Sequence, residues 1–223
     1  MDGSATPRTP RRGPAGGLYH RRVLLAIDTS AGSSVAVVDL EGGILAQVDE
    51  ADTRRHAEVV GSLILRALEK AGVAPGELSG VVAGMGPGPF TGLRVGIAAA
   101  RAFAAGIGRP VVPLVSHDAL ALDADGPIAV VTDARRRELA WSTYSGSDER
   151  GLPIRAAGPA LAPAAEIEEA VAGFRRIDAP VIPAGPLGML AERLYAAGRP
   201  FGPTEPLYLR APDVTVPKGV VLP

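Results

Sequence analysis

The sequence contains no cysteine, and only 4% of its 223 residues are aromatic. The absence of cysteine excludes a disulfide framework and thiolate metal sites, and it agrees with a cytoplasmic location. Because aromatic rings are scarce, the core must be built from Ala, Val, Leu and Ile. A hydrophobic content of 47% nevertheless predicts a globular fold.

Hydrophobic runs of membrane-spanning length are also missing. Arg94 and Arg101 interrupt the longest candidate, whereas a spanning helix needs about 20 predominantly apolar residues. The sequence therefore predicts no membrane segment.

The net charge of −1 is unevenly distributed along the chain. Residues 1–22 hold five arginines and one acid, Asp2, so this segment carries +4 and the remainder −5. The segment is rich in Pro and Gly and lacks an apolar core, which predicts a disordered extension rather than a signal peptide. A contact of its arginines with RNA phosphates is the weaker alternative. The acidic body is a poor platform for nucleic acid by itself.

Three short segments of branched apolar residues open the body of the chain, at Val23–Asp28, 34–39 and 44–49. The turn signal between the last two predicts antiparallel neighbours. Residues 56–71 then place apolar side chains along one helical face and end at Gly72. Strands at 80–85 and 110–115 flank a helix at 91–106. This order predicts an α/β fold of the ribonuclease-H-like kind, the lobe that actin-like ATPases repeat.

The second half of the chain gives weaker signals. We expect strands at 127–132 and 138–145, a helix at 164–172, a short strand at 180–184 and a helix at 187–197. The resulting organisation is a disordered extension at 1–22, a first lobe at 23–122, a reduced second lobe at 123–202 and a C-terminal tail at 203–223.

A glycine-rich loop follows the strand predicted at 80–85. Its glycines permit backbone conformations that other residues resist. Thr91 is placed to cap the next helix, where free N–H groups attract anions. The loop matches neither a Rossmann fingerprint nor a P-loop. It is either an anion cradle that includes Gly86, Gly88 and Thr91, or a rigid turn that lets strand and helix approach closely.

Two turns carry carboxylates at the ends of predicted strands. Asp28, Thr29 and Ser30 offer a carboxylate, hydroxyls and N–H groups that can hold Mg²⁺ through water, although tight turns commonly use the same residues. Asp133, followed by Arg135, resembles a second such turn across a cleft. A surface hairpin would give the same residues.

The helix at 92–106 is apolar nearly all round, since its only charges are Arg94 and Arg101, seven residues apart on one face. Such a helix is covered on more than one side. The second cover is the helix at 56–71, another subunit, or both. We expect a partner interface formed by residues of the two helices: Val60, Leu63, Ile64, Ala67, Val95, Ala99, Ala102 and Phe103.

Catalytic and metal-binding sets are hard to assemble from this sequence. Of the three histidines, only His117 stands in a segment that hints at a metal helix, and a second ligand is missing there. The sequence also lacks a Ser-His-Asp set and a Gly-x-Ser-x-Gly elbow. It therefore predicts no catalytic residue and no metal site.

Five segments of the sequence form a recognisable set. They are, in chain order, Leu25-Ala-Ile-Asp-Thr-Ser30, Arg55-His56, residues 86–96, Asp133-Ala-Arg135 with Glu138, and Tyr208-Leu-Arg210. The stretch Gly86-Pro-Gly-Pro-Phe-Thr-Gly92 is quite specific, and the others are convincing in combination. Over about residues 23–210 the chain resembles the TsaB (YeaZ) family, the dimerisation subunits of the bacterial machinery that makes threonylcarbamoyladenosine in tRNA.

The resemblance implies an actin-like fold of two lobes with mixed sheets, the second lobe reduced. It also implies the catalytic paralogue TsaD as partner, an ATPase, TsaE, that joins them, and tRNA reached only through the complex. In TsaD a His-x-x-x-His pair holds the metal, whereas here His117 is followed by Ala121 at the second position. The implied role is a noncatalytic scaffold, which forms homodimers through the same faces when the partner is absent.

A second hypothesis stays open, namely an active actin-like ATPase or a glycoprotease-type metalloenzyme. A metalloenzyme is disfavoured, because His117 has no second metal ligand beside it. The ATPase would need a nucleotide cleft, of which the sequence retains a vestige: Asp28, Thr29, Ser30, Gly86, Gly88, Thr91 and Asp133. We therefore expect no resident cofactor, and weak ATP or ADP binding is the exception to test.

Overall fold

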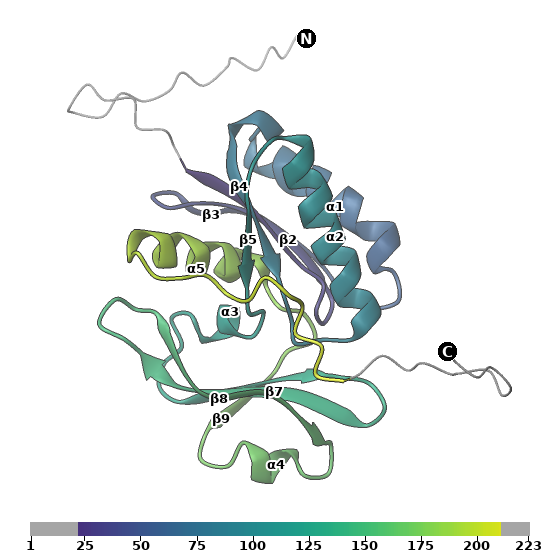
Figure 1. Cartoon of the computed structure of the whole chain (residues 1–223), viewed down its shortest axis with the longest axis vertical. Helices are drawn as coiled ribbons and strands as arrows, with labels where there is room; N and C mark the ends of the chain where they lie inside the picture. Colours follow the sequence, from purple (N-terminus) through teal and green to yellow (C-terminus); the bar gives the residue numbers. More distant parts are fainter. Residues whose placement is uncertain (1–21, 211–223) are drawn as a thin grey trace, which may run out of the picture.

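The computed structural model describes residues 22–210, and these form two β-sheets with helices packed around them (Figure 1). Of the extension expected at 1–22, all but Arg22 lies outside the described residues, as does the tail beyond Arg210. Within residues 22–210, none of the helices has the length and apolarity that a membrane span requires.

The first sheet has five strands in the order β3-β2-β1-β4-β5. The strands β1 (Val23–Asp28), β2 (Ser33–Asp39) and β3 (Gly43–Glu50) are antiparallel neighbours, as predicted. The strands β4 (Leu78–Gly84) and β5 (Val111–Leu114) run parallel to β1. Every residue of β1 and β2 is buried, because helices cover both faces of the sheet.

On one face of this sheet lie α1 (His56–Ala71) and α2 (Phe90–Gly106). The predicted bounds of α1 are confirmed, and Gly72 ends it in the left-handed conformation with φ 62°. On the other face lies α5 (Ala184–Ala196), which packs against β1 and β2. Leu187 and Leu190 of α5 meet Ala26 and Val38 there.

The second sheet has four strands in the order β8-β7-β6-β9. Its members are β6 (Ile128–Asp133), β7 (Glu138–Ser147), β8 (Pro153–Pro163) and β9 (Arg175–Asp178). β9 is parallel to β6, so this sheet is mixed like the first. Two one-turn helices accompany it, α3 (Asp118–Ala121) and α4 (Ile167–Ala170). The predicted α/β arrangement of two mixed sheets is confirmed.

Some predicted elements of the second half are wrong. The segment at 180–184 is not a strand: Pro180 and Pro183 have no N–H to donate to a ladder, and buried Ile182 anchors the entry into α5 instead. The helix expected at 164–172 is a single turn. The prediction also omitted β8 and β9. The lobe boundary at 122–123 stays a prediction, and α5, counted there with the second lobe, packs on the first sheet.

The C-terminal segment 201–210 runs from the end of α5 past the first sheet toward the second (Figure 1). Gly202 and Leu207 donate backbone hydrogen bonds to Pro113 and Met85, each at 2.8 Å. Arg101 of α2 donates to the carbonyl of Thr204, and Arg94 donates to the Tyr208 hydroxyl. The two arginines therefore share a face, as predicted, and this segment of the chain contacts it.

Candidate functional site

The first carboxylate turn lies inside the molecule. Asp28, Thr29 and Ser30, at the end of β1, are at most 2% exposed. Oδ1 of Asp28 accepts hydrogen bonds from the N–H and the hydroxyl of Ser30, at 2.8 and 2.6 Å. A Cβ added at Gly84 would lie 1.8 Å from its Oδ2, so glycine is required beside it. Burial raises the pKa of Asp28 to about 6, although hydrogen bonds from Ser116 and Ser30 act in the opposite direction.

The glycine loop packs directly on this turn. The Thr29 hydroxyl accepts a hydrogen bond from the N–H of Gly96 at 2.9 Å and donates to the carbonyl of Gly92 at 2.6 Å. A Cβ added at Gly88 would lie 2.2 Å from the carbonyl oxygen of Ser30. Of the two interpretations of the loop, the rigid turn for close approach describes these contacts.

The beginning of α2 differs from the prediction. The helix starts at Phe90, one residue early, so Pro89 is its N-cap and no side chain caps it. Thr91 is therefore an exposed residue of the first turn and not the cap. Gly86 lies deeper in the loop, where its N–H donates to the Ser116 hydroxyl at 2.9 Å.

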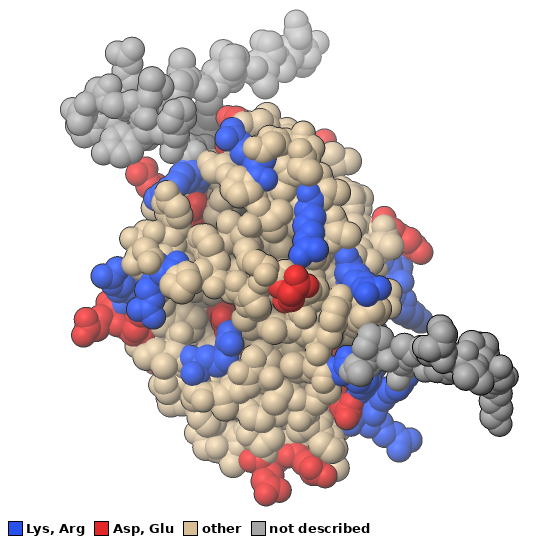
Figure 2. Space-filling model, viewed as in Figure 1, with Lys and Arg blue, Asp and Glu red and all other residues tan. Residues whose placement is uncertain are grey.

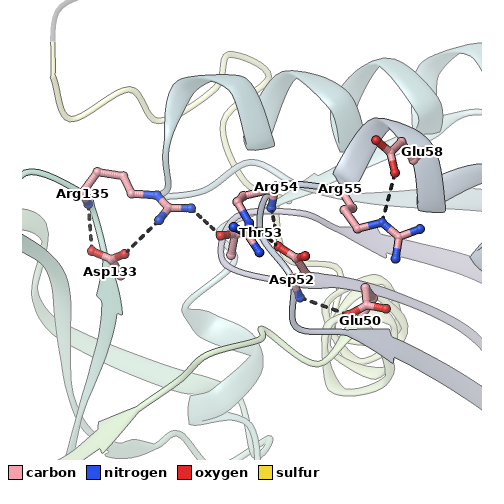
Figure 3. A network of polar contacts seen from close by, with 8 residues as sticks. All are labelled: Glu50, Asp52, Thr53, Arg54, Arg55, Glu58, Asp133 and Arg135. Atoms are coloured by element: carbon pink, nitrogen blue, oxygen red, sulfur yellow. Dashed lines mark hydrogen bonds and ion pairs between the residues drawn. The ribbon is translucent and has the colours of Figure 1, made fainter.

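The second carboxylate turn lies at the end of β6 and is exposed. Oδ1 of Asp133 accepts a hydrogen bond from the N–H of Arg135 at 2.9 Å, and its Oδ2 lies 3.7 Å from the guanidinium. Arg135 reaches across to the loop between β3 and α1, where it donates to the Thr53 hydroxyl (Figure 3). The structure thus packs the Asp28 turn against the glycine loop, while Asp133 is occupied with Arg135. Nucleotide binding by these predicted residues stays a prediction.

His117 is fully buried and fully hydrogen-bonded. Its Nδ1 lies 2.9 Å from the Ser142 hydroxyl, and its Nε2 lies 3.0 Å from the Thr132 hydroxyl. Burial is the main cause that lowers its pKa to about 3, so the ring is neutral. Residues 22–210 hold no group of three or more His, Asp or Glu side chains placed to bind a metal ion. His117 therefore joins α3 to the second sheet.

The predicted partner interface needs a correction on α1. Its four predicted residues lie in the core of the chain with exposures of 8% or less: Val60, Leu63, Ile64 and Ala67. They face the first sheet, because the apolar stripe of an amphipathic helix packs on the core. On α2, Ala102 is exposed, and Val95, Ala99 and Phe103 are half-buried, so their part of the interface stays a prediction.

The side of α1 that faces away from the sheet carries its own apolar row. Ala57, Gly61 and Leu65 follow one another at intervals of four residues and are all exposed, Leu65 by 67%. On α2, Ala98 and Ala102 are exposed. We call these five residues, together with half-buried Val95, Ala99 and Phe103, the outer face. Small residues here let another helix approach closely.

Sequence reasoning missed a cavity of about 560 Å³ beside the buried turn. Four of the five segments on which the family resemblance rests contribute residues to the lining of this cavity, and this shared specificity could have indicated it. These contributions are His56, residues 88–92 with Val95, Ala134 with Arg135, and Tyr208 to Arg210. Segments far apart in the sequence therefore meet at one place.

Comparison with known proteins gives consistent results. A family model described as "TsaD: tRNA N6-adenosine threonylcarbamoyltransferase" matches residues 31–182. An uncharacterised protein of Mycobacterium tuberculosis is 40% identical over 200 residues, covering 85% of this chain and 92% of that protein. The Haemophilus influenzae tRNA threonylcarbamoyladenosine biosynthesis protein TsaB is 32% identical over 125 residues, covering 53% of this chain and 52% of that protein.

A solved structure agrees in fold. YeaZ from Pseudomonas aeruginosa superposes with a TM-score of 0.67 at 28% identity, covering 84% of this chain and all of that one. The likeness therefore extends over the whole of the solved chain.

Proposed function

The chain belongs to the TsaB (YeaZ) family, with its actin-like ATPase fold, and from this premise we propose that it is a noncatalytic subunit in the synthesis of threonylcarbamoyladenosine in tRNA. Its partner in this proposal is a TsaD-type catalytic paralogue, which modifies the adenosine next to the anticodon. A TsaE-type ATPase joins the pair, and tRNA is reached through the complex.

The observation that carries the proposal is the contrast within α1 and α2. Their inner sides are closed against the first sheet, whereas five residues of the outer face are exposed: Ala57, Gly61, Leu65, Ala98 and Ala102. Figure 2 shows scattered charges on a largely uncharged surface. Burial of the outer face by a second subunit of related fold would remove its apolar area from water.

The buried polar groups support a role without catalysis. Oδ1 of Asp28 and both ring nitrogens of His117 have hydrogen-bond partners within the chain, and the two residues are at most 1% exposed. A catalytic acid, base or metal ligand must reach its substrate or ion, and these two groups do not reach solvent. The chemistry of the complex is accordingly assigned to the partner.

The test is the size of the complex between the purified chain and the TsaD-type paralogue of the same organism. We expect a heterodimer, and Leu65→Asp with Ala102→Glu should weaken its affinity at least tenfold. Ile154→Asp is the matched control, because Ile154 is an exposed apolar residue of β8 in the second sheet.

A heterodimer of unchanged affinity with the double variant would sink the assignment of the interface. If the wild-type chain forms only a homodimer, and the same variant abolishes it, the outer face is an interface between copies of this chain instead.

A further inference from the structure

The C-terminal segment 201–210, which we call the strap, follows α5 and contains no helix or strand (Figure 1). It begins against the first sheet, where the N–H of Gly202 donates a hydrogen bond to the carbonyl of Pro113 in the edge strand β5. A Cβ added at Gly202 would lie 3.0 Å from the Cα of Leu114, so glycine lets the strap lie directly against this strand. Farther along, the N–H of Leu207 donates to the carbonyl of Met85, just beyond β4. The strap is therefore anchored to the first sheet at two points.

The strap also binds both charged residues of α2. Arg101 donates a hydrogen bond to the carbonyl of Thr204 at 3.1 Å, and Arg94 donates to the hydroxyl of Tyr208 at 3.2 Å. The ring centroids of Tyr208 and Phe90 are 4.8 Å apart, and the guanidinium of Arg94 lies 3.7 Å from the Phe90 centroid. These contacts explain why an otherwise uncharged helix carries two cations: both are binding groups for the strap.

The last residue of the strap reaches the second sheet. Arg210 forms an ion pair with Glu138, the first residue of β7. The backbone of Glu138 is fixed in the turn after β6, because its N–H donates to the carbonyl of Arg135 and its carbonyl accepts from Ala134. The side chains of the ion pair are 32% and 35% exposed, and exposed ion pairs contribute little to stability. The strap therefore ends in a contact that can break while both sheets stay folded.

A second attachment of this sheet, through α3, is buried. The two ring nitrogens of His117 lie within 3.0 Å of hydroxyls on β6 and β7. Asp118 accepts hydrogen bonds of 2.6 Å from Tyr144 and Arg155. His117 and Tyr144 are at most 1% exposed, and breaking buried hydrogen bonds is costly. The α3 attachment is therefore the firm one, and the strap is the weaker one.

Where the strap reaches the second sheet, the cavity of about 560 Å³ separates the two halves of the molecule. Val95 lines it from α2, Leu161 lines it from β8, and residues 208–210 line it from the strap. Close-packed side chains would fix the angle between the sheets by themselves, but they do not fill this space. The angle here depends instead on polar contacts, those of the strap and that of Arg135 with Thr53.

We infer that the strap is a latch, closed in this structure, which holds the second sheet at a fixed angle to the first. Its opening side is formed by Tyr208 and Arg210. When both release, the second sheet is free to swing about α3, and the width of the cavity changes. Exposed Ala98 lies between Arg94 and Arg101 on the same side of α2, so the strap also borders the outer face. The inference goes beyond the proposed function and concerns contacts within this chain, so each can fail without the other.

The experiment measures the distance between the two sheets by double electron–electron resonance on the full chain. The sequence has no cysteine, so two introduced cysteines carry the spin labels. Glu69→Cys on α1 and Ala172→Cys after α4 place one label on each side, and both residues are exposed. We expect a single narrow distance distribution in this background. Arg210→Gln should at least double its width, and Arg210→Gln with Tyr208→Ala should widen it further.

The matched control is Arg176→Gln. It removes ion pairs with Glu168 and Asp178, which lie in the second half of the chain and do not involve the strap. We expect it to leave the distance distribution unchanged. Circular dichroism establishes that each variant is folded.

A charge exchange separates the latch from general damage to the fold. Arg210→Glu and Glu138→Arg should each widen the distribution when made alone, and the two together should restore the narrow one. Three results would overturn the inference. The first is a distribution that stays narrow in Arg210→Gln with Tyr208→Ala, the second is equal widening by Arg176→Gln, and the third is no restoration by the exchanged pair.

Discussion

Two regions of the molecule differ in the contacts that the chain gives to their side chains. One is the interior between β1, the glycine loop and α3, and the other is the outer face of α1 and α2. Inside, Oδ1 of Asp28, the hydroxyl of Thr29 and both ring nitrogens of His117 are hydrogen-bonded within the chain. Outside, Leu65 and four small residues of the outer face are exposed. The difference indicates that the chain uses its buried polar groups for its own architecture, while the surface of its helices remains available to a second subunit.

The largest expected effect tests the inner side of α1. Leu63 is 1% exposed in the first core, and Leu63→Ala should lower the free energy of unfolding by about 3 kcal/mol through lost burial and the cavity that remains. Chemical denaturation measures this change. A loss below about 1 kcal/mol would mean that this side of α1 is not the closed side.

Asp28→Asn tests the closed interior through pH. The native pKa of Asp28 is raised from 3.8 to about 6, so the folded chain holds a proton that the unfolded chain releases, and this contribution to stability is lost as pH rises through that interval. Asparagine does not titrate.

The stability of Asp28→Asn relative to wild type should therefore rise between pH 4 and pH 7, by up to about 3 kcal/mol. Because the other groups titrate in both proteins, the difference isolates this carboxylate. Denaturation curves at several pH values measure it, and a difference that does not vary with pH would show that Asp28 is accessible to solvent.

A smaller effect is expected for the hydrogen bonds around His117. Ser142→Ala leaves Nδ1 without its partner at 2.9 Å and should cost about 1–2 kcal/mol. Thermal unfolding measures this loss, with Ser145→Ala as the control, because Ser145 is an exposed residue of the same strand. Equal stability of the two variants would argue that His117 is not locked in the core.

The smallest effect is expected on the outer face. Leu65 is 67% exposed, so Leu65→Ala should change the stability of the isolated chain by less than about 0.5 kcal/mol. The contrast with Leu63, two residues earlier on the same helix, is a direct comparison of the two sides. A large loss of stability would show that the chain itself covers Leu65.

The first half of the chain was largely predictable from its sequence. The apolar period of α1 and the glycine that ends it gave the exact bounds, and the branched runs marked β1 to β3. Periodicity does not reveal which helix side a partner would cover, because Leu63 and Leu65 have the same chemistry and only packing separates them. For this reason the predicted interface included four core residues.

The second half and the cavity were less predictable. β8 contains Pro153, Pro159 and Pro163, which read as strand breakers but are tolerated on an edge strand. Three consecutive arginines, Arg135 to Arg137, have positive φ in the turn after β6, where no glycine or asparagine signals the turn. The convergence of Arg54, His56 and Arg210 at one cavity depends on tertiary structure that no local pattern encodes.

In the proposed function, this chain binds a catalytic partner and contributes no catalytic group of its own. A kinetic titration tests both parts: the rate of threonylcarbamoyladenosine formation on tRNA is measured at a fixed amount of the TsaD-type paralogue, as the concentration of this chain is raised. We expect Leu65→Asp to shift the half-maximal concentration upward at least tenfold and to leave the plateau unchanged. We expect Asp28→Asn to change neither. A plateau lowered by Asp28→Asn, in a variant that binds the paralogue normally, would show that this chain takes part in catalysis.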